Sequence, residues 1–167
     1  KRMQKDFGAD VFTFSYKDGQ DKADEILKAV PKDGKYDVII VGIHNYALKP
    51  ADNFGISAAA INLYKQLNFI KTVTMTFGNV LATKNFCDAW TLLACYQDDA
   101  ITQQAAADYL SGKFEWQGKL PASVCRFKFG AGIVKNEKDV LFYGENLLFS
   151  YNLDQKHISR NYFQELK

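Results

Sequence analysis

The segment that most constrains the fold is 37–43, DVIIVGI, a nearly continuous run of β-branched and other apolar residues. A strand exposed to water on one face normally alternates polar and apolar side chains, whereas a continuous run is typical of a strand buried on both faces. Strands of that kind occur in parallel sheets that helices cover on each side. Segment 37–43 therefore predicts a parallel strand inside an α/β protein.

Helical and extended patterns alternate along the rest of the chain. Extended patterns predict further strands at 11–16, 72–77, 89–95 and 122–129. Apolar residues spaced three and four apart predict helices at 2–7, 21–30, 57–67 and 98–110. This alternation predicts an α/β fold with a mostly parallel, open sheet between helices, a three-layer α/β/α sandwich of the flavodoxin-like kind.

The predicted helices have recognisable end signals. Asp21, Ser57 and either Asp98 or Asp99 stand where a side chain caps a helix N-terminus. Gly8 directly follows the first helical pattern, as a residue that ends a helix commonly does.

Composition excludes several classes of protein. With 47% hydrophobic residues, and with 21 basic against 19 acidic residues, the chain is neither a disordered segment nor a strongly basic nucleic-acid-binding domain. No stretch approaches the roughly 20 consecutive apolar residues of a membrane-spanning helix. The length suits one folded domain. Because Lys1 stands where an initiator methionine would be, we expect this chain to be a piece of a longer protein.

The three cysteines do not suggest a metal centre. Cys87, Cys95 and Cys125 form no CxxC pair, so a thiolate site for zinc or an iron–sulfur cluster is not expected. An odd number excludes a complete disulfide framework but leaves one bridge open. The alternative is that all three are small buried apolar residues.

No catalytic motif of a familiar kind is present. The chain lacks the phosphate-binding patterns GxxxxGK[ST] and GxGxxG, and it lacks the GxSxG nucleophile elbow. The GAG at 130–132 is expected to be a plain turn. Asp52 is the one carboxylate in the loop 44–55, and Asp98 and Asp99 have helix capping as their ordinary role. Glycoside hydrolysis needs two carboxyl groups facing one cleft, so this chain alone lacks such an apparatus.

Two loops are the places to look for a ligand, because ligands of open parallel sheets bind beyond the carboxyl ends of the strands. These loops are 44–55 and 78–86, and His44 directly follows the strand predicted at 37–43. His44 either contacts a ligand or forms a hydrogen bond with a backbone carbonyl. Asn79 is expected to order its own turn, and His157 is expected on the surface.

Several segments, in this order and spacing, resemble the C-terminal α/β domain of glycoside hydrolase family 3. The similarity extends over about residues 1–134 and is carried by segments 36–44, 54–67, 76–79, 94–97, 102–112, 118–124 and 127–133. In that family a domain of this kind follows a (β/α)8 barrel, which carries the aspartate nucleophile. The resemblance therefore implies that the nucleophile lies outside this chain.

One difference from the family pattern limits the resemblance to one branch of the family. The family's β-glucosidases supply a glutamate acid/base from the loop that corresponds to 44–55, and this loop contains no glutamate. In lacking this glutamate the chain resembles the family's β-N-acetylglucosaminidase branch, in which a His/Asp pair inside the barrel transfers the proton. That branch hydrolyses N-acetylglucosaminides, often from peptidoglycan, by a retaining route without metal or other cofactor.

The resemblance implies a division of the chain and a set of contacts. Residues 1–134 correspond to the family domain, and 135–167 to an extension that leads into a following domain. Short strands at 140–143 and 147–151 and a helix from Asp154 are predicted in or near that extension. The residues expected to line a carbohydrate cleft at the junction with the barrel are His44, Asn45, Tyr46, Lys49, Asp52 and Asn53.

Other interpretations remain open. The resemblance implies a periplasmic or secreted parent protein, with the barrel and a carbohydrate as partners and with neither nucleic acid nor a membrane segment. The loop 44–55 either touches substrate or only contacts the barrel. A different class of function is an independent flavodoxin-like module that binds a small ligand, and a third is a purely structural docking domain.

Overall fold

The structure is a computed structural model of the 167-residue chain. It describes residues 2–31, 35–44, 46–68, 71–113, 117–132, 142–143 and 146–147. None of the helices in these ranges is long and apolar enough to cross a membrane.

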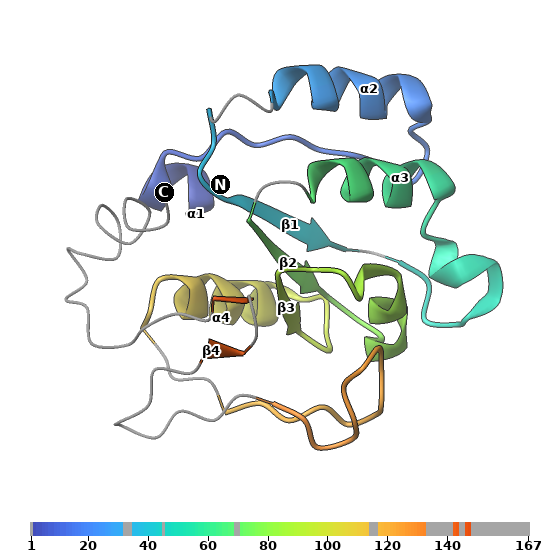
Figure 1. Cartoon of the computed structure of the whole chain (residues 1–167), viewed down its shortest axis with the longest axis vertical. Helices are drawn as coiled ribbons and strands as arrows, with labels where there is room; N and C mark the ends of the chain where they lie inside the picture. The colour runs from blue at the N-terminus through green and yellow to red at the C-terminus, as the bar shows by residue number, and fades with distance from the viewer. Residues whose placement is uncertain are drawn as a thin grey trace.

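Three parallel strands form the centre of the fold (Figure 1). They are β1 (Ile39–Ile43), β2 (Thr72–Thr76) and β3 (Thr91–Ala94), in the spatial order β1-β2-β3. Ile43 pairs with Thr76, and Thr76 pairs with Ala94, so the three strands end level with one another. The prediction of an α/β fold with parallel strands is confirmed.

The helices begin largely where the sequence predicts. They are α1 (Arg2–Phe7), α2 (Gln20–Ala29), α3 (Ala58–Leu67) and α4 (Ala100–Leu110). Ser57 caps α3 by accepting a hydrogen bond from Ala60 N, and Asp99 caps α4 by accepting one from Thr102 N. The prediction that Asp21 caps α2 is wrong, because Asp21 lies within the first turn and Gly19 is the capping residue. Glycine can occupy that position without a side-chain bond.

The middle strand is buried along its whole length, although three of its five residues are threonines. Each threonine hydroxyl shares a hydrogen bond with another side chain, and the partners are Asn68, Tyr64 and Thr83 for Thr72, Thr74 and Thr76 respectively. A buried hydroxyl without a partner would cost about 1–3 kcal/mol. These bonds hold α3 and the short helix η2 (Val80–Phe86) over the threonine face of β2.

The opposite face of β2 is apolar and packs against different elements. Val73 and Met75 form one core cluster with Leu93 of β3 and with Ala106 and Leu110 of α4. A second cluster lies between α2 and α3 and includes Ala23, Ile26, Val30, Leu63 and Leu67. In Figure 1, α2 and α3 lie above β1, and α4 lies to the left of β3.

The strand predicted at 11–16 is wrong. These residues form no strand, and Val11, Phe12 and Tyr16 are exposed. Phe14 of this segment packs against the cluster between α2 and α3. Asp10, the residue before the segment, accepts a hydrogen bond from the Tyr36 hydroxyl at 2.6 Å. Alternation of apolar residues describes a surface that suits a strand, but a strand also needs a paired neighbour.

The strand predicted at 122–129 is also wrong. Val124 and Phe127 form an isolated antiparallel bridge, in which each backbone N–H donates to the other residue's carbonyl at 3.0 Å. Between them Cys125 has a φ of 54°, which an extended strand does not contain. The segment folds back on itself in a tight turn.

The C-terminal part is described only in a small antiparallel pair. This pair consists of β4 (Phe142–Tyr143) and β5 (Asn146–Leu147), which fall in or beside the predicted strands 140–143 and 147–151. The helix predicted from Asp154 and the surface position predicted for His157 lie outside the described residues.

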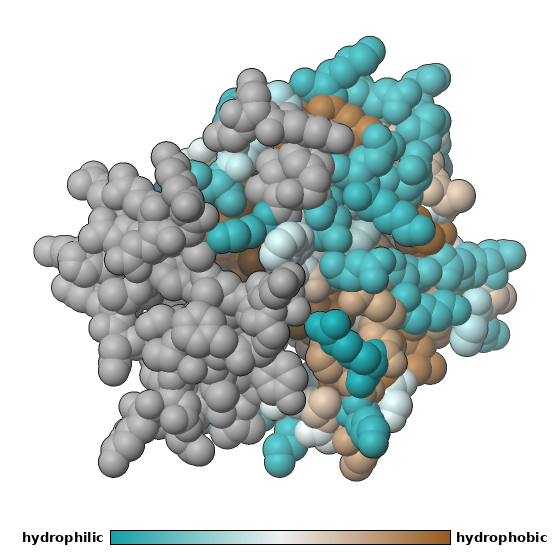
Figure 2. All heavy atoms as spheres, in the orientation of Figure 1, coloured by the Kyte–Doolittle hydropathy of each residue, from teal (hydrophilic) through white to brown (hydrophobic). Residues whose placement is uncertain are grey.

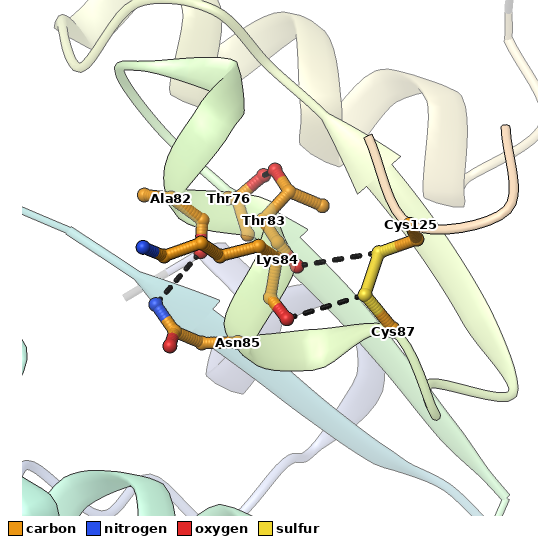
Figure 3. The surroundings of a disulfide bond; sticks show 7 residues. All are labelled: Thr76, Ala82, Thr83, Lys84, Asn85, Cys87 and Cys125. Atoms are coloured by element: carbon orange, nitrogen blue, oxygen red, sulfur yellow. Dashed lines mark hydrogen bonds between the residues drawn. A yellow bond between two sulfur atoms is a disulfide. The ribbon is translucent and has the colours of Figure 1, made fainter. Parts of the chain in front are cut away.

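A disulfide joins Cys87, just after η2, to Cys125 (Figure 3). The prediction that all three cysteines are small buried apolar residues is wrong for these two, and the single bridge that the odd count left open is present. The two sulfur atoms lie 3.2 Å from Lys84 O and 3.7 Å from Thr83 O. Since a bridged sulfur carries no hydrogen, these are packing contacts rather than hydrogen bonds.

We predict that this bridge contributes strongly to stability. The two cysteines are 38 residues apart, and cross-linking a loop of that length contributes about 4 kcal/mol through the entropy of the unfolded chain. Reduction, or the Cys125→Ser variant, should therefore lower the Tm in thermal unfolding followed by circular dichroism. Cys95→Ser leaves the bridge intact and is the matched control, because reduction should lower its Tm by the same amount as that of the unaltered protein. An unchanged Tm after reduction would contradict the prediction.

Candidate functional site

Three side chains form a row just beyond the carboxyl ends of the strands. The strand ladders continue by one hydrogen bond each, from Phe77 N to Ile43 O at 2.9 Å and from Cys95 N to Thr76 O at 2.8 Å. His44, Phe77 and Cys95 therefore follow β1, β2 and β3 in register. Because side chains alternate along a strand, all three lie on the face opposite the β2 threonines.

The His44 ring is held from two sides. It stacks on Phe77 with a centroid separation of 4.2 Å and an angle of 12° between the rings. Its Nδ1 lies 2.9 Å from Asp98 Oδ1, and Gln103 Nε2 donates to the same oxygen at 2.9 Å. A carboxylate can only accept a hydrogen bond, so Nδ1 carries the proton and, in the neutral ring, Nε2 is an acceptor.

Gly42 provides the room that this arrangement needs. A Cβ atom at Gly42 would lie 2.7 Å from His44 Nε2, closer than a real Cβ approaches another atom. Glycine inside a strand often marks a place where another group approaches the backbone closely. Here that group is the imidazole ring of His44.

A second network fixes the start of the loop 44–55. The Tyr46 hydroxyl donates to Asn79 O at 3.0 Å, and Asn79 Nδ2 donates to Leu48 O at 2.8 Å. Asn79 also caps η2 through Leu81 N, which confirms the prediction that it orders its own turn. The Tyr46 ring lies over Gly78, whose φ of 122° favours glycine.

The end of the same loop is an unusual left-handed turn. Asp52, Asn53 and Phe54 in η1 (Ala51–Gly55) have φ values of 48°, 54° and 62°. Phe54 is only 1% exposed and contacts Tyr46 edge to face, and its carbonyl accepts a hydrogen bond from Ala47 N at 2.6 Å. Burial of Phe54 and closure of the loop stabilise a backbone that non-glycine residues rarely adopt.

The predicted cleft residues have different surroundings. His44, Lys49 and Asp52 are exposed, and Tyr46 and Asn53 are partly buried. The Asn53 amide lies 3.5 Å from Ile56 O, at the long limit of a hydrogen bond. Asn45 lies outside the described residues. The sequence therefore predicted a loop at the correct edge of the sheet. Binding of a ligand by its side chains stays a prediction.

The sequence interpretation missed the role of Asp98. Of the two candidate capping residues, Asp99 is the one that caps α4. Asp98 instead forms a hydrogen bond with the His44 ring, for which one interpretation had predicted a backbone carbonyl as partner. A signal for this was available. Asp98 follows the strand predicted at 89–95, and the carboxyl ends of parallel strands meet at one edge of a sheet.

Asp98 also affects its neighbours electrostatically. Burial raises the pKa of Tyr46 to about 12 and the pKa of the Cys95 thiol to about 11, and the charge of Asp98 adds to both shifts. Both groups are therefore neutral at physiological pH. Among the described residues no group of three or more His, Cys, Asp or Glu side chains could hold a metal ion.

Apolar side chains are exposed around this edge. Leu48, Leu81 and Tyr96, from the segments after β1, β2 and β3, are 75%, 42% and 41% exposed. Figure 2 shows hydrophobic atoms at the lower right, where Figure 1 places η2. Tyr96 has a φ of 56°, and its hydroxyl donates to Lys119 O at 3.0 Å. The edge thus combines a fixed His–Asp pair with an exposed apolar border.

No family model, curated protein or solved structure matches the chain. The arrangement offers one oriented imidazole acceptor, exposed polar loop residues and an apolar border, which together suit binding of a neutral polar ligand or of another protein surface.

We predict that Tyr46→Phe destabilises the fold by about 1 kcal/mol, because it removes the hydrogen bond to Asn79 O. Urea unfolding followed by fluorescence measures the change. Tyr16→Phe is the matched control, since Tyr16 is 77% exposed and the same hydroxyl is lost there. Equal midpoints for the two variants would contradict the role given to the Tyr46 hydroxyl.

We predict that Cys95 reacts slowly with iodoacetamide until strongly alkaline pH. Only the thiolate is nucleophilic, and burial raises the pKa of this thiol from 9.0 to about 11. In the oxidised protein Cys95 is a free thiol while Cys87 and Cys125 are bridged, so mass spectrometry can follow its alkylation. A rate that levels off near the ordinary pKa of 9.0 would contradict the prediction.

The same shift links Cys95 to stability. The unfolded chain loses the thiol proton at lower pH than the folded chain does. The contribution of the protonated thiol is therefore complete below pH 9.0 and is lost as the pH rises through about 11. In Cys95→Ala, the fall of Tm over this pH window should be shallower.

Proposed function

We propose that this chain is the accessory, non-catalytic C-terminal α/β domain of a glycoside hydrolase family 3 β-N-acetylglucosaminidase. The parent protein would hydrolyse N-acetylglucosaminides in carbohydrate or peptidoglycan metabolism. The single observation that carries the proposal is the ordered set of family-like segments within residues 1–134. The position of the loop 44–55 at the carboxyl edge of a parallel sheet supports it.

The carboxylates near the described site support a non-catalytic role. Asp98 is engaged by His44 and Gln103, and Asp99 caps α4. Asp52 lies on the exposed turn η1. A retaining glycosidase needs a nucleophile and an acid/base about 5 Å apart across one bond. We therefore assign both groups to the (β/α)8 barrel of the parent protein.

A three-layer α/β/α sandwich of the flavodoxin-like kind is part of the proposal. Two features support it: α3 and η2 lie against the threonine face of β2, and α4 packs on the other face. In a right-handed parallel fold, connections that step the sheet in one direction lie on the same face. The connections through α3 and η2 both step from β1 toward β3, and they share a face.

The exposed apolar border is the surface that we assign to the barrel. Contacts between domains of one chain bury mixed polar and apolar surface, and Leu48, Leu81 and Tyr96 offer such a surface around the polar loop. The Cys87–Cys125 bridge supports the proposed periplasmic or secreted location, because disulfides persist in oxidising compartments.

We predict that the isolated chain does not hydrolyse p-nitrophenyl N-acetyl-β-glucosaminide, whereas the longer parent protein does. Chromogenic assays on the two proteins measure this difference. An Asp→Asn change at the barrel nucleophile of the parent should abolish its turnover. Turnover by the isolated chain that is lost in an Asp52→Asn variant would overturn the proposal, as would a parent protein without a barrel.

The alternative of an independent flavodoxin-like module has a separate signature. Purified chain that carries bound flavin would be yellow and fluorescent. That outcome would replace the proposal, because the family domain that the sequence resembles carries no cofactor.

A further inference from the structure

We propose that Asp98 is a positioning residue that holds His44 so that its Nε2 accepts a hydrogen bond from a sugar hydroxyl or acetamido N–H. This inference rests on the proposed function for the choice of sugar as ligand. It adds a residue from the loop before α4 to a site otherwise assigned to the loop 44–55. It also gives His44 one defined chemical role, that of a hydrogen-bond acceptor at Nε2.

Two contacts fix the His44 ring. Asp98 Oδ1 lies 2.9 Å from Nδ1, and Phe77 supports one ring face, so the ring has both its tautomer and its plane fixed. The Asp98 carboxylate is itself oriented by Gln103 at 2.9 Å, and its side chain is 14% exposed. A histidine held by a carboxylate in this way presents its other nitrogen as an oriented acceptor.

One face of β1 is exposed next to the His44 ring. Ile40, Gly42 and His44 occupy alternate positions along β1 and the residue after it, so they lie on one face of the sheet, and all three are exposed. His44 Nε2 lies beside Gly42, in the space that a side chain at this position would fill. The His44 side chain is 36% exposed. A ligand that lies along this face can place its apolar C–H surface on Ile40 and a hydrogen-bond donor at Nε2.

The chemistry of that surface favours a neutral, polyhydroxylated ligand. Nε2 in this tautomer accepts but does not donate, so it selects O–H or N–H donors over carboxylates and phosphates. The adjacent Asp98 charge further disfavours an anion. A sugar such as N-acetylglucosamine combines hydroxyl and amide donors with the flat apolar face that the strand can contact.

The test uses the full chain with His157→Gln, so that a single histidine gives a ring signal. Isotope-edited nitrogen NMR at about pH 8, where histidine is ordinarily neutral, reports the tautomer directly. We expect protonated Nδ1 and an acceptor Nε2. Titration with N-acetylglucosamine should then shift the Nε2 signal and the Gly42 amide signal together.

Asp98→Asn is the decisive variant. An asparagine amide can donate to Nδ1, which shifts the ring toward the other tautomer, so the fixed acceptor is lost. We expect a mixed or reversed tautomer and an apparent Kd for the sugar raised about tenfold, the scale of one hydrogen bond. Asp99→Asn removes the same charge one residue away and retains a capping side chain, so it should change neither the tautomer nor the Kd.

Three results would overturn the inference. The first is a wild-type ring in which Nε2 carries the proton. The second is an Asp98→Asn ring with an unchanged tautomer, and the third is a titration that leaves the Nε2 and Gly42 amide signals unmoved. His44→Gln gives a second check if Asp98→Asn does not fold, since it should abolish the sugar-dependent shift at Gly42. None of these readouts depends on hydrolysis by the parent protein, so failure here and failure of the proposed function are distinguishable.

Discussion

Burial of the threonine-rich strand β2 is the constraint on which the rest of the structure depends. Three hydroxyls lie inside the protein, and each needs a partner because an unbonded buried hydroxyl is costly. The partners come from α3, from η2 and from the residue that follows α3. Polar bonds therefore place these elements on one face, while apolar packing with α4 holds the other.

The site at the carboxyl edge is a consequence of that arrangement. Because the three strands are parallel and end level, the residues that follow them meet in a row. Phe77 is buried at the centre of the row and supplies a flat surface for the His44 ring. The loop before α4 places Asp98 at the edge of the ring, where it bonds Nδ1. A fixed imidazole thus results from β1, β2 and the β3–α4 connection acting together.

Local signals in the sequence predicted much of the fold. The apolar run at 37–43 became β1, and Ser57 and Asp99 cap the helices that they precede. These features depend on near neighbours in the chain, so a pattern can reveal them. Segments 11–16 and 122–129 have strand-like patterns but form no strand, because pairing with a distant partner is not a property of the segment itself.

The sequence by itself determined the parallel α/β class and the two loops that lie at the carboxyl edge of its sheet. It did so through hydrophobic periodicity and helix-capping residues, which act over a few residues. Only the tertiary structure decided that Cys87 pairs with Cys125 and that Asp98 binds His44, across 38 and 54 positions of chain respectively. Contacts at such separations depend on how the strands and helices pack. The sequence pattern places His44 and Asp98 after parallel strands at one edge of the sheet, but it does not pair their side chains.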